Sequence, residues 1–218
     1  MKKSRMMALV LALAMLLVLA TGCGDQDTFV GSWSATLDMA DQLNKTLAAG
    51  DPETAEYIQL DDVTLTIAYT FNKDGTYSMK LDEDSIDEAY ESIKESLSKG
   101  METYLVEAVK QQNGLTMAIG EILAQMGVSS MDELINGVMS KADFTSALGD
   151  FSSEGKYEVK DGKLYTSDSL DTAISETEYE TYEILSDTQI KLIKPYGEKA
   201  EDEEMVEAYY PAILKKVG

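Results

Sequence analysis

The sequence has no histidine and only one cysteine among its 218 residues. Without histidine, His-based general-base catalysis, Ser-His-Asp triads and His-ligated metal sites are excluded. A single cysteine cannot form an intramolecular disulfide, so the folded domain must be stable through its core alone. No pair of carboxylates lies in an identifiable catalytic setting. We therefore expect a protein that is not an enzyme, has no catalytic residues and needs no cofactor.

Basic residues are also scarce, with 18 lysines and arginines against 40 acidic residues and a net charge of −22. A surface this acidic repels nucleic acid and anionic headgroups, so no nucleic-acid partner is expected. The excess of acid serves either solubility or an acidic binding face, and the composition leaves both open.

A calcium site is not predicted. Residues 82–93, DEDSIDEAYESI, resemble a calcium-binding loop only loosely. Asp87 stands where the sharp turn needs glycine, and Ile93 stands where the closing glutamate belongs. We interpret the segment as the start of a helix with dipole-favoured acids, and predict no metal ligands.

The N-terminal residues have the composition of a targeting segment. Lys2, Lys3 and Arg5 precede ALVLALAMLLVLA (8–20), a run too short for a permanent membrane span and typical of a signal peptide. Small residues at 20–22 then lead into Cys23. Residues 1–22 are therefore expected to be a signal peptide outside the folded domain, and residues 23–28 to be a short tether.

The junction at Cys23 resembles the lipobox of bacterial lipoproteins. The resemblance implies that Cys23 carries diacylglycerol and becomes the mature N-terminus, so the protein is expected to be extracytoplasmic and lipid-anchored to the bacterial cell membrane. The alternative is an ordinary secretory peptide followed by a free cysteine.

The clearest strand pattern covers residues 63–71, where apolar and polar residues alternate. A turn at 72–75 leads into a second alternating run at 76–81, which predicts a hairpin. If a small apolar ligand binds inside the sheet, the inward candidates are Val63, Leu65, Ile67, Tyr69, Tyr77 and Met79.

A helical pattern covers residues 85–149, between the third and fourth expected strands. Apolar residues recur at spacings of three and four from Ile86 onward, and capping boxes are expected at 85–88 and 130–133. Gly100 is expected to break or kink the first helix. A shorter helix is expected within 38–57. Five methionines in the inserted block serve either as core filling or as an adaptable binding surface.

Further strands are expected at 29–37, in hairpins within 155–168 and 180–195, and at the end of 205–218, after an acidic loop at 197–204. Pro211 favours an edge or a bulge. The total is about eight hairpin-linked strands, and closure into an up-and-down antiparallel barrel removes their edges. The fold class predicted is mainly β with an inserted helical block.

The first strand contains Gly31-Ser32-Trp33 and the last ends in Lys215-Lys216, with an F-x-x-D-G-x-Y hairpin at 71–77. Together these resemble the lipocalin, or calycin, superfamily. The resemblance implies a lipocalin-like barrel over 29–218, interrupted at 85–149, with Gly31, Trp33 and Lys215 as structural residues and Trp33 beneath a basic side chain. Lipocalins usually carry arginine at that place. Trp33 alternatively is an ordinary core aromatic.

Two functions follow as hypotheses. One is a lipid-anchored binding protein whose barrel interior, or a cleft beside the helices, holds a small apolar ligand or lipid. The other is a structural or interaction lipoprotein with a packed barrel, in which the acidic helical insertion contacts an envelope protein. A free volume inside the barrel would favour the first hypothesis over the second.

Overall fold

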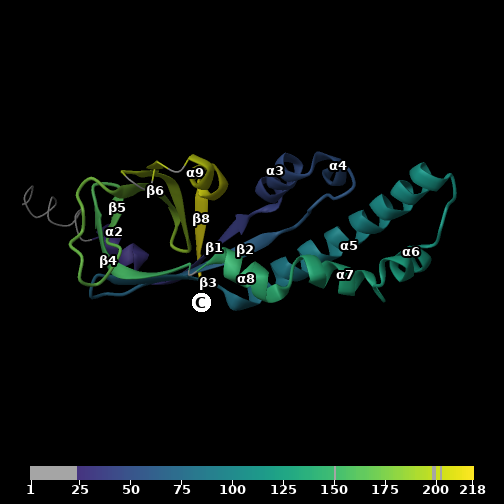
Figure 1. Ribbon diagram of the computed structural model, residues 1–218. Coiled ribbons are helices and arrows are strands. Elements are labelled where there is room, and N and C mark those ends of the chain that lie inside the picture. The colour runs from purple at the N-terminus through teal and green to yellow at the C-terminus, as the bar shows by residue number, and fades with distance from the viewer. Residues whose placement is uncertain (1–23, 150, 198–199, 202) are drawn as a thin grey trace, which may run out of the picture. The chain divides into compact units, whose positions relative to one another are not determined.

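The computed structural model describes residues 24–149, 151–197, 200–201 and 203–218 (Figure 1). The signal peptide expected at 1–22 and the lipidation expected at Cys23 lie outside the described residues. Within the described residues, no helix is both long enough and apolar enough to cross a membrane.

Eight strands form one closed antiparallel barrel in which sequence neighbours pair and the last strand returns to the first. The predicted fold class, a barrel with an inserted helical block, is confirmed. The longest connection between neighbouring strands is the insertion between β3 and β4, and the connections between β1 and β2 and between β7 and β8 also contain helices. The strands are β1 (Gly31–Asp38), β2 (Thr64–Phe71), β3 (Thr76–Leu81), β4 (Ser152–Lys160), β5 (Lys163–Thr166), β6 (Tyr179–Ser186), β7 (Gln189–Tyr196) and β8 (Ala212–Lys216).

Alternation of side chains decides which face of each strand is buried. In β4, residues 155, 157 and 159 are buried while their neighbours are exposed, and β2 alternates in the same way along its whole length. Pro211 lies immediately before β8, where its missing N–H costs no ladder hydrogen bond.

The chain divides into two compact units. The barrel unit comprises the described residues of Met1–Ala35, Ala68–Lys80 and Ser152–Gly218, and the helical unit comprises Thr36–Ile67 and Leu81–Phe151. The boundary falls inside β1 and β2, so one part of each of these strands belongs to the helical unit.

Six helices belong to the helical unit, and Figure 1 shows α6 and α7 returning beside the long helix α5. Helices fill the predicted insertion between β3 and β4. The hydrophobic core of the unit is formed by Ile58, Leu60, Val63, Leu65, Ala89 and Ile93. The helices are α3 (Ala40–Gly50), α4 (Pro52–Ala55), α5 (Glu83–Asn113), α6 (Ile119–Met126), α7 (Met131–Val138) and α8 (Lys141–Leu148).

The start of α5 differs from the predicted capping box at 85–88. Asp82 is the N-cap, and its side chain accepts a hydrogen bond from the Ser85 N–H at 3.2 Å. Ser85 is buried instead, and its hydroxyl accepts a hydrogen bond from Thr66 N. Ser130 caps α7 as predicted, by accepting from Glu133 N.

Gly100 does not end α5, which continues through it to Asn113. A Cβ on Gly100 would lie 2.5 Å from Ile58 Cγ1 and 2.7 Å from Tyr57 O. The glycine is therefore needed for close packing against residues 57–58, and the expected break is wrong.

Two short helices in the barrel unit replace segments expected to be irregular. Helix α2 (Gly24–Phe29) occupies the predicted tether, and α9 (Glu203–Tyr209) occupies the end of the predicted acidic loop and the residues after it. Neither segment has a long apolar periodicity, which is why the pattern did not reveal them. Each ends in an aromatic residue that contacts the barrel interior, Phe29 in α2 and Tyr209 in α9.

Candidate functional site

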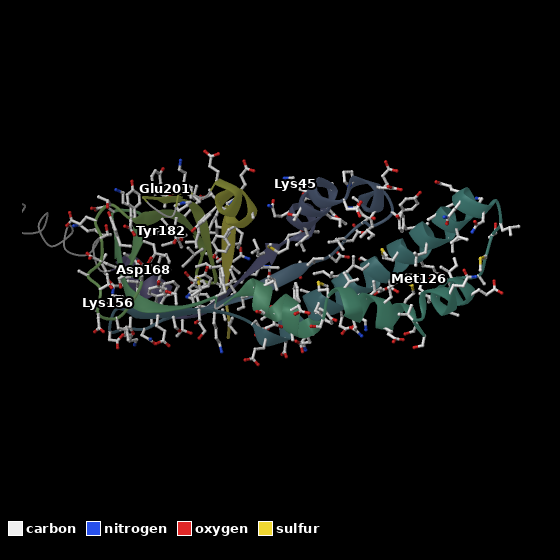
Figure 2. The ribbon with its side chains drawn as sticks, viewed as in Figure 1. Lys45, Met126, Lys156, Asp168, Tyr182 and Glu201 are labelled. Atoms are coloured by element: carbon white, nitrogen blue, oxygen red, sulfur yellow. The ribbon has the colours of Figure 1, made fainter. Side chains whose placement is uncertain are left out.

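Aromatic rings occupy the barrel interior around Phe71. The Phe71 ring lies 5.4 Å from Phe29, 4.9 Å from Tyr157 and 6.1 Å from Tyr77, measured between centroids. Phe29 also meets Tyr182 edge-on at 4.9 Å. Figure 2 shows side chains crowding the space between the strands around Tyr182. This part of the interior is filled by the protein's own side chains.

Helix α2 brings Phe29 into that cluster. It packs on β4, and the Gln26 side chain hydrogen-bonds the Tyr157 hydroxyl, which itself donates to Asn72 O at 3.0 Å. Burial raises the pKa of Tyr157, and the hydrogen bond to Gln26 acts in the opposite direction. Gln26, in the segment expected to be a tether, therefore contacts a buried tyrosine, and Phe29, expected as the first residue of a strand, ends this helix and enters the barrel core.

Trp33 is completely buried, and its indole Nε1 donates to Phe29 O at 2.6 Å. The basic side chain over its ring belongs to Lys216, whose Nζ lies 5.1 Å from the ring centroid. Lys215, the predicted partner, pairs instead with Ser34 and lies on the other face of β8. The alternation along the last strand could have identified Lys216, because Ala212, Leu214 and Lys216 share one face. Ala212 and Leu214 on that face are buried.

Gly31 permits the approach of Lys216. Its φ is +132°, and a Cβ there would lie 3.2 Å from Lys216 Cε. The expected structural roles of Gly31 and Trp33 thus have a geometric basis, whereas the role assigned to Lys215 is performed by Lys216.

The structure separates the six residues proposed as ligand lining. Tyr69 and Tyr77 are buried in the barrel unit, and Met79 lies there half-buried. Val63 and Leu65 belong to the core of the helical unit, and Ile67, also buried, is the last β2 residue of that unit. Because β2 extends through the boundary between the units, one alternating pattern supplies two different cores.

A polar cluster missed by the sequence analysis lies inside the barrel unit. Tyr69 and Tyr209 share a hydroxyl–hydroxyl hydrogen bond, and Tyr210 hydrogen-bonds Glu180. Glu180 lies on the inward face of β6, in the register row that contains Leu164 and Pro195. The alternation along β6 could have placed the Glu180 side chain on the inward face. Its tyrosine neighbours lie at the end of α9 and in β2, and no local sequence pattern brings these segments together.

Burial dominates the titration of this cluster. It raises the pKa of Tyr69 well above its ordinary value, with smaller contributions from the nearby Tyr209 and Glu180. Burial likewise raises the pKa values of Tyr209 and Tyr210, and the charge of Glu180 acts in the same direction. The three phenols therefore remain neutral and serve as hydrogen-bonding groups.

An open depression of about 740 Å³ lies on the surface of α8. It is lined by Lys141, Ala142, Thr145, Ser146 and Gly149. Among these lining residues only Lys141 is charged, and Asp87 engages it at 2.6 Å. In the part of the chain that the structure describes, no group of three or more Asp, Glu or Cys side chains is placed to hold a metal ion.

Charge is concentrated on the helical unit. The residues of this unit include 21 acids and only 5 lysines. Four of the lysines form ion pairs within the unit: Lys94 with Asp132, Lys99 with Glu95, Lys110 with Glu107 and Lys141 with Asp87. Most of the acidic side chains consequently lack a cationic partner of their own among the described residues.

Comparisons with protein-family models, with curated proteins and with solved structures find no match to this chain.

Proposed function

We propose that the protein is a lipid-anchored, extracytoplasmic lipoprotein without enzymatic activity, whose acidic helical unit binds a cationic partner protein of the cell envelope. The observation that carries the proposal is the imbalance of charge on the helical unit, 21 acids against 5 lysines of which four are already ion-paired. Complementary charge accelerates encounter and selects partners, so a basic protein surface is the matching chemistry.

The barrel serves in this proposal as a packed base. The ring cluster around Phe71 uses the interior space that an apolar ligand would need, and an eight-stranded barrel has room for either packed side chains or one small ligand. Two of the six residues suggested as lining, Val63 and Leu65, are committed to the helical core. These contacts support the interaction hypothesis over ligand carriage.

The binding surface is best placed where α5 begins and α7 ends. Tyr90 of α5 donates to Asn136 of α7 at 3.1 Å, which brings these segments together. Val138, 74% exposed, lies just beyond Asn136. The exposed acids Asp84, Glu88 and Glu91 recur at spacings of four and three, which puts them on one face of α5. An exposed apolar side chain and a face of carboxylates in the same unit suit a basic surface with an apolar centre.

Photo-crosslinking in intact cells tests this surface. A photoreactive amino acid at position 138 should capture one reproducible protein. Neutralising Asp84, Glu88 and Glu91 as D84N, E88Q and E91Q should reduce the yield about tenfold or more, because rim charges control encounter. The matched control neutralises three exposed acids of the barrel unit, as D168N, D171N and E176Q, and should leave the yield unchanged.

Two results would contradict the proposal. One is a crosslinking pattern without a reproducible partner, or one indifferent to the α5 substitutions. The other is native mass spectrometry of the protein from its natural host that recovers a stoichiometric apolar molecule, since the ring cluster around Phe71 uses the interior space that such a molecule would need. Lipid attachment is tested separately: the mass of the N-terminal peptide should show diacylglycerol on Cys23, and the Cys23→Ser variant should be lost from the membrane fraction at physiological salt.

A further inference from the structure

The outer face of β4–β7 presents two adjacent rows of like side chains. The register aligns Lys160, Lys163, Thr181 and Lys194 across the four strands. Two residues along each strand, a second row aligns Glu158, Tyr165, Tyr179 and Tyr196. Strand periodicity puts both rows on one face, opposite the buried row that contains Val159 and Leu164. We call these eight residues the lysine–tyrosine face.

Ring contacts hold this face in a defined arrangement. Tyr179 lies between its two neighbours, with ring centroids 5.6 Å from Tyr165 and 4.7 Å from Tyr196. Lys163 Nζ lies 4.0 Å from the Tyr179 ring centroid, and Lys194 Nζ lies 4.9 Å from that of Tyr196. Two of the three ammonium groups are therefore positioned beside the rings before any ligand arrives.

The lysines of this face differ from those of the helical unit. Among the described residues, none of Lys160, Lys163 and Lys194 forms an ion pair, whereas four of the five lysines in the helical unit do. Glu158 is the one acid within the two rows. Exposed Asp161 follows Lys160 in the turn, and exposed Glu183 lies two residues past Thr181 on β6, so the local exception to the net charge of −22 is confined to the two rows.

An apolar residue extends the face. A register shift in the β6–β7 pairing, between Thr181 and Tyr182, leaves Ile193 without a partner on β6. The bulge exposes the Ile193 side chain, 41% of which is accessible, directly before Lys194. Bulges re-aim side chains, and this one places an aliphatic group next to the lysine row.

We infer that the lysine–tyrosine face binds the anionic headgroups of the phospholipid bilayer. Lysine ammonium groups pair with lipid phosphates, tyrosine rings suit the boundary between headgroups and acyl chains, and Ile193 adds apolar contact. Acids farther from the membrane than about 8 Å oppose this contact weakly, because charges at that distance are largely screened at physiological ionic strength.

The start of the described chain favours the membrane as the occupant. Helix α2 begins at Gly24, directly after the cysteine proposed to carry lipid, and its six residues extend roughly 9 Å. Its last residue, Phe29, touches Tyr182 of β6, and the helix packs on β4. Strands β4 and β6, which carry part of the face, thus contact the helix that follows the proposed anchor, as does β2 through Phe71. The orientation of the face toward the bilayer rests on the proposed lipid anchor.

A fluorescent reporter on the face tests the inference in the lipidated protein. Thr181 lies between the lysines, and Thr181→Cys provides a thiol for an environment-sensitive dye, with Thr172→Cys in the exposed β5–β6 loop as the control position. The protein is reconstituted into vesicles of phosphatidylcholine alone or mixed with phosphatidylglycerol. We expect the emission of the dye at position 181 to shift to the blue only in vesicles that contain phosphatidylglycerol, and the emission of the dye at position 172 not to shift. The shift should disappear in K160Q/K163Q/K194Q and persist in K45Q/K73Q/K80Q, which removes three exposed lysines elsewhere.

A second arm separates the face from the anchor. The mature chain from residue 23 with Cys23→Ser should float with phosphatidylglycerol vesicles at low salt, and K160Q/K163Q/K194Q should weaken this binding roughly a hundredfold, about fivefold per lysine. If the wild-type protein carries no lipid while this lysine-dependent flotation persists, the anchor proposal fails and the inference stands. Equal flotation, or equal dye shifts, in K160Q/K163Q/K194Q and K45Q/K73Q/K80Q would overturn the inference. So would binding to inorganic polyphosphate without binding to vesicles, which would identify a soluble phosphate polymer as the occupant.

Discussion

Trp33 links three segments of the barrel unit. Its Nε1 donates to Phe29 O, its backbone pairs with Lys216, and the Lys216 ammonium lies over its ring. Lysine stems cover apolar surface while the charge stays in water, so the exposed Lys216 shields a completely buried indole. The contact ties the first strand to the last.

The neighbouring lysines provide a matched test of this contact. Lys216→Met keeps the stem but removes the cation, and should lower the free energy of unfolding by about 0.5–1 kcal/mol. Lys215→Met changes a side chain on the other face of β8 and should have no such effect. Denaturant unfolding monitored by Trp33 fluorescence measures both, and equal midpoints for the two variants would show that the cation contributes nothing.

The buried tyrosines predict an alkaline transition. The native fold raises the pKa values of Tyr69, Tyr157, Tyr209 and Tyr210, so it favours their neutral forms. That contribution to stability is complete below the ordinary tyrosine pKa of about 10 and is lost as pH rises above it. In the native protein, these four of the 12 tyrosines should stay neutral at a pH that ionises the others, and should ionise only when the barrel unfolds.

Ultraviolet absorbance of tyrosinate, read together with circular dichroism, measures this titration. All 12 tyrosines should ionise near pH 10 in guanidinium, which serves as the unfolded reference. In Tyr69→Phe the number of late-titrating groups should fall by one. Ionisation of every tyrosine at ordinary pH with the circular dichroism unchanged would refute the prediction.

At the scale of an element, two glycines in helices of the same unit, one in α5 and one in α7, have opposite roles. Gly100 is buried where α5 passes Ile58 and the Tyr57 carbonyl, and a Cβ would collide with both. Gly137 in α7 is exposed, and a Cβ there would meet nothing within 4 Å. Helix propensity alone disfavours both glycines equally.

Alanine at the two positions should therefore change stability in opposite directions. Gly137→Ala should stabilise by about 0.5–1 kcal/mol, the usual gain when a helical glycine is replaced. Gly100→Ala should destabilise by about 1–3 kcal/mol, because the added methyl group overpacks the contact with residues 57–58. Thermal unfolding followed at the helical band measures both, and a stabilising Gly100→Ala would show that the close approach is not required.

At the scale of the whole molecule, two hydrophobic cores share one chain. Ile93 belongs to the core of the helical unit, and Ile190 is completely buried in the barrel unit. The only tryptophan, Trp33, lies in the barrel unit, so its fluorescence reports on the barrel while far-ultraviolet circular dichroism reports chiefly on the helices.

Removing core volume in one unit should mainly affect that unit. Ile93→Ala should lower the free energy of unfolding of the helical unit by about 2–5 kcal/mol. The midpoint of the transition seen by circular dichroism should fall, while the midpoint seen by Trp33 fluorescence changes little. Ile190→Ala should lower the Trp33 transition. If each variant moved both transitions equally, the continuous strands β1 and β2 would couple the two units into one cooperative system.

Features that depend on neighbouring residues in the sequence were predictable. The alternation at 63–71, the turn at 72–75, the cap at Ser130 and the number of strands all follow from local periodicity and turn chemistry, and hairpin-linked strands close most simply as a barrel. The helical insertion is equally local, because spacings of three and four are characteristic of one face of a helix.

Tertiary structure alone decided which core receives each side chain. An alternating strand specifies a buried face but not the partner that buries it, so Val63 and Leu65 pack with helices while Tyr69 faces the barrel interior. The same reason explains the retention of Gly100, the docking of Phe29 by α2 and the tyrosines around Glu180. The lysine–tyrosine face arises from register across four strands. Each of these depends on distances between residues remote in sequence, which only the closed fold establishes.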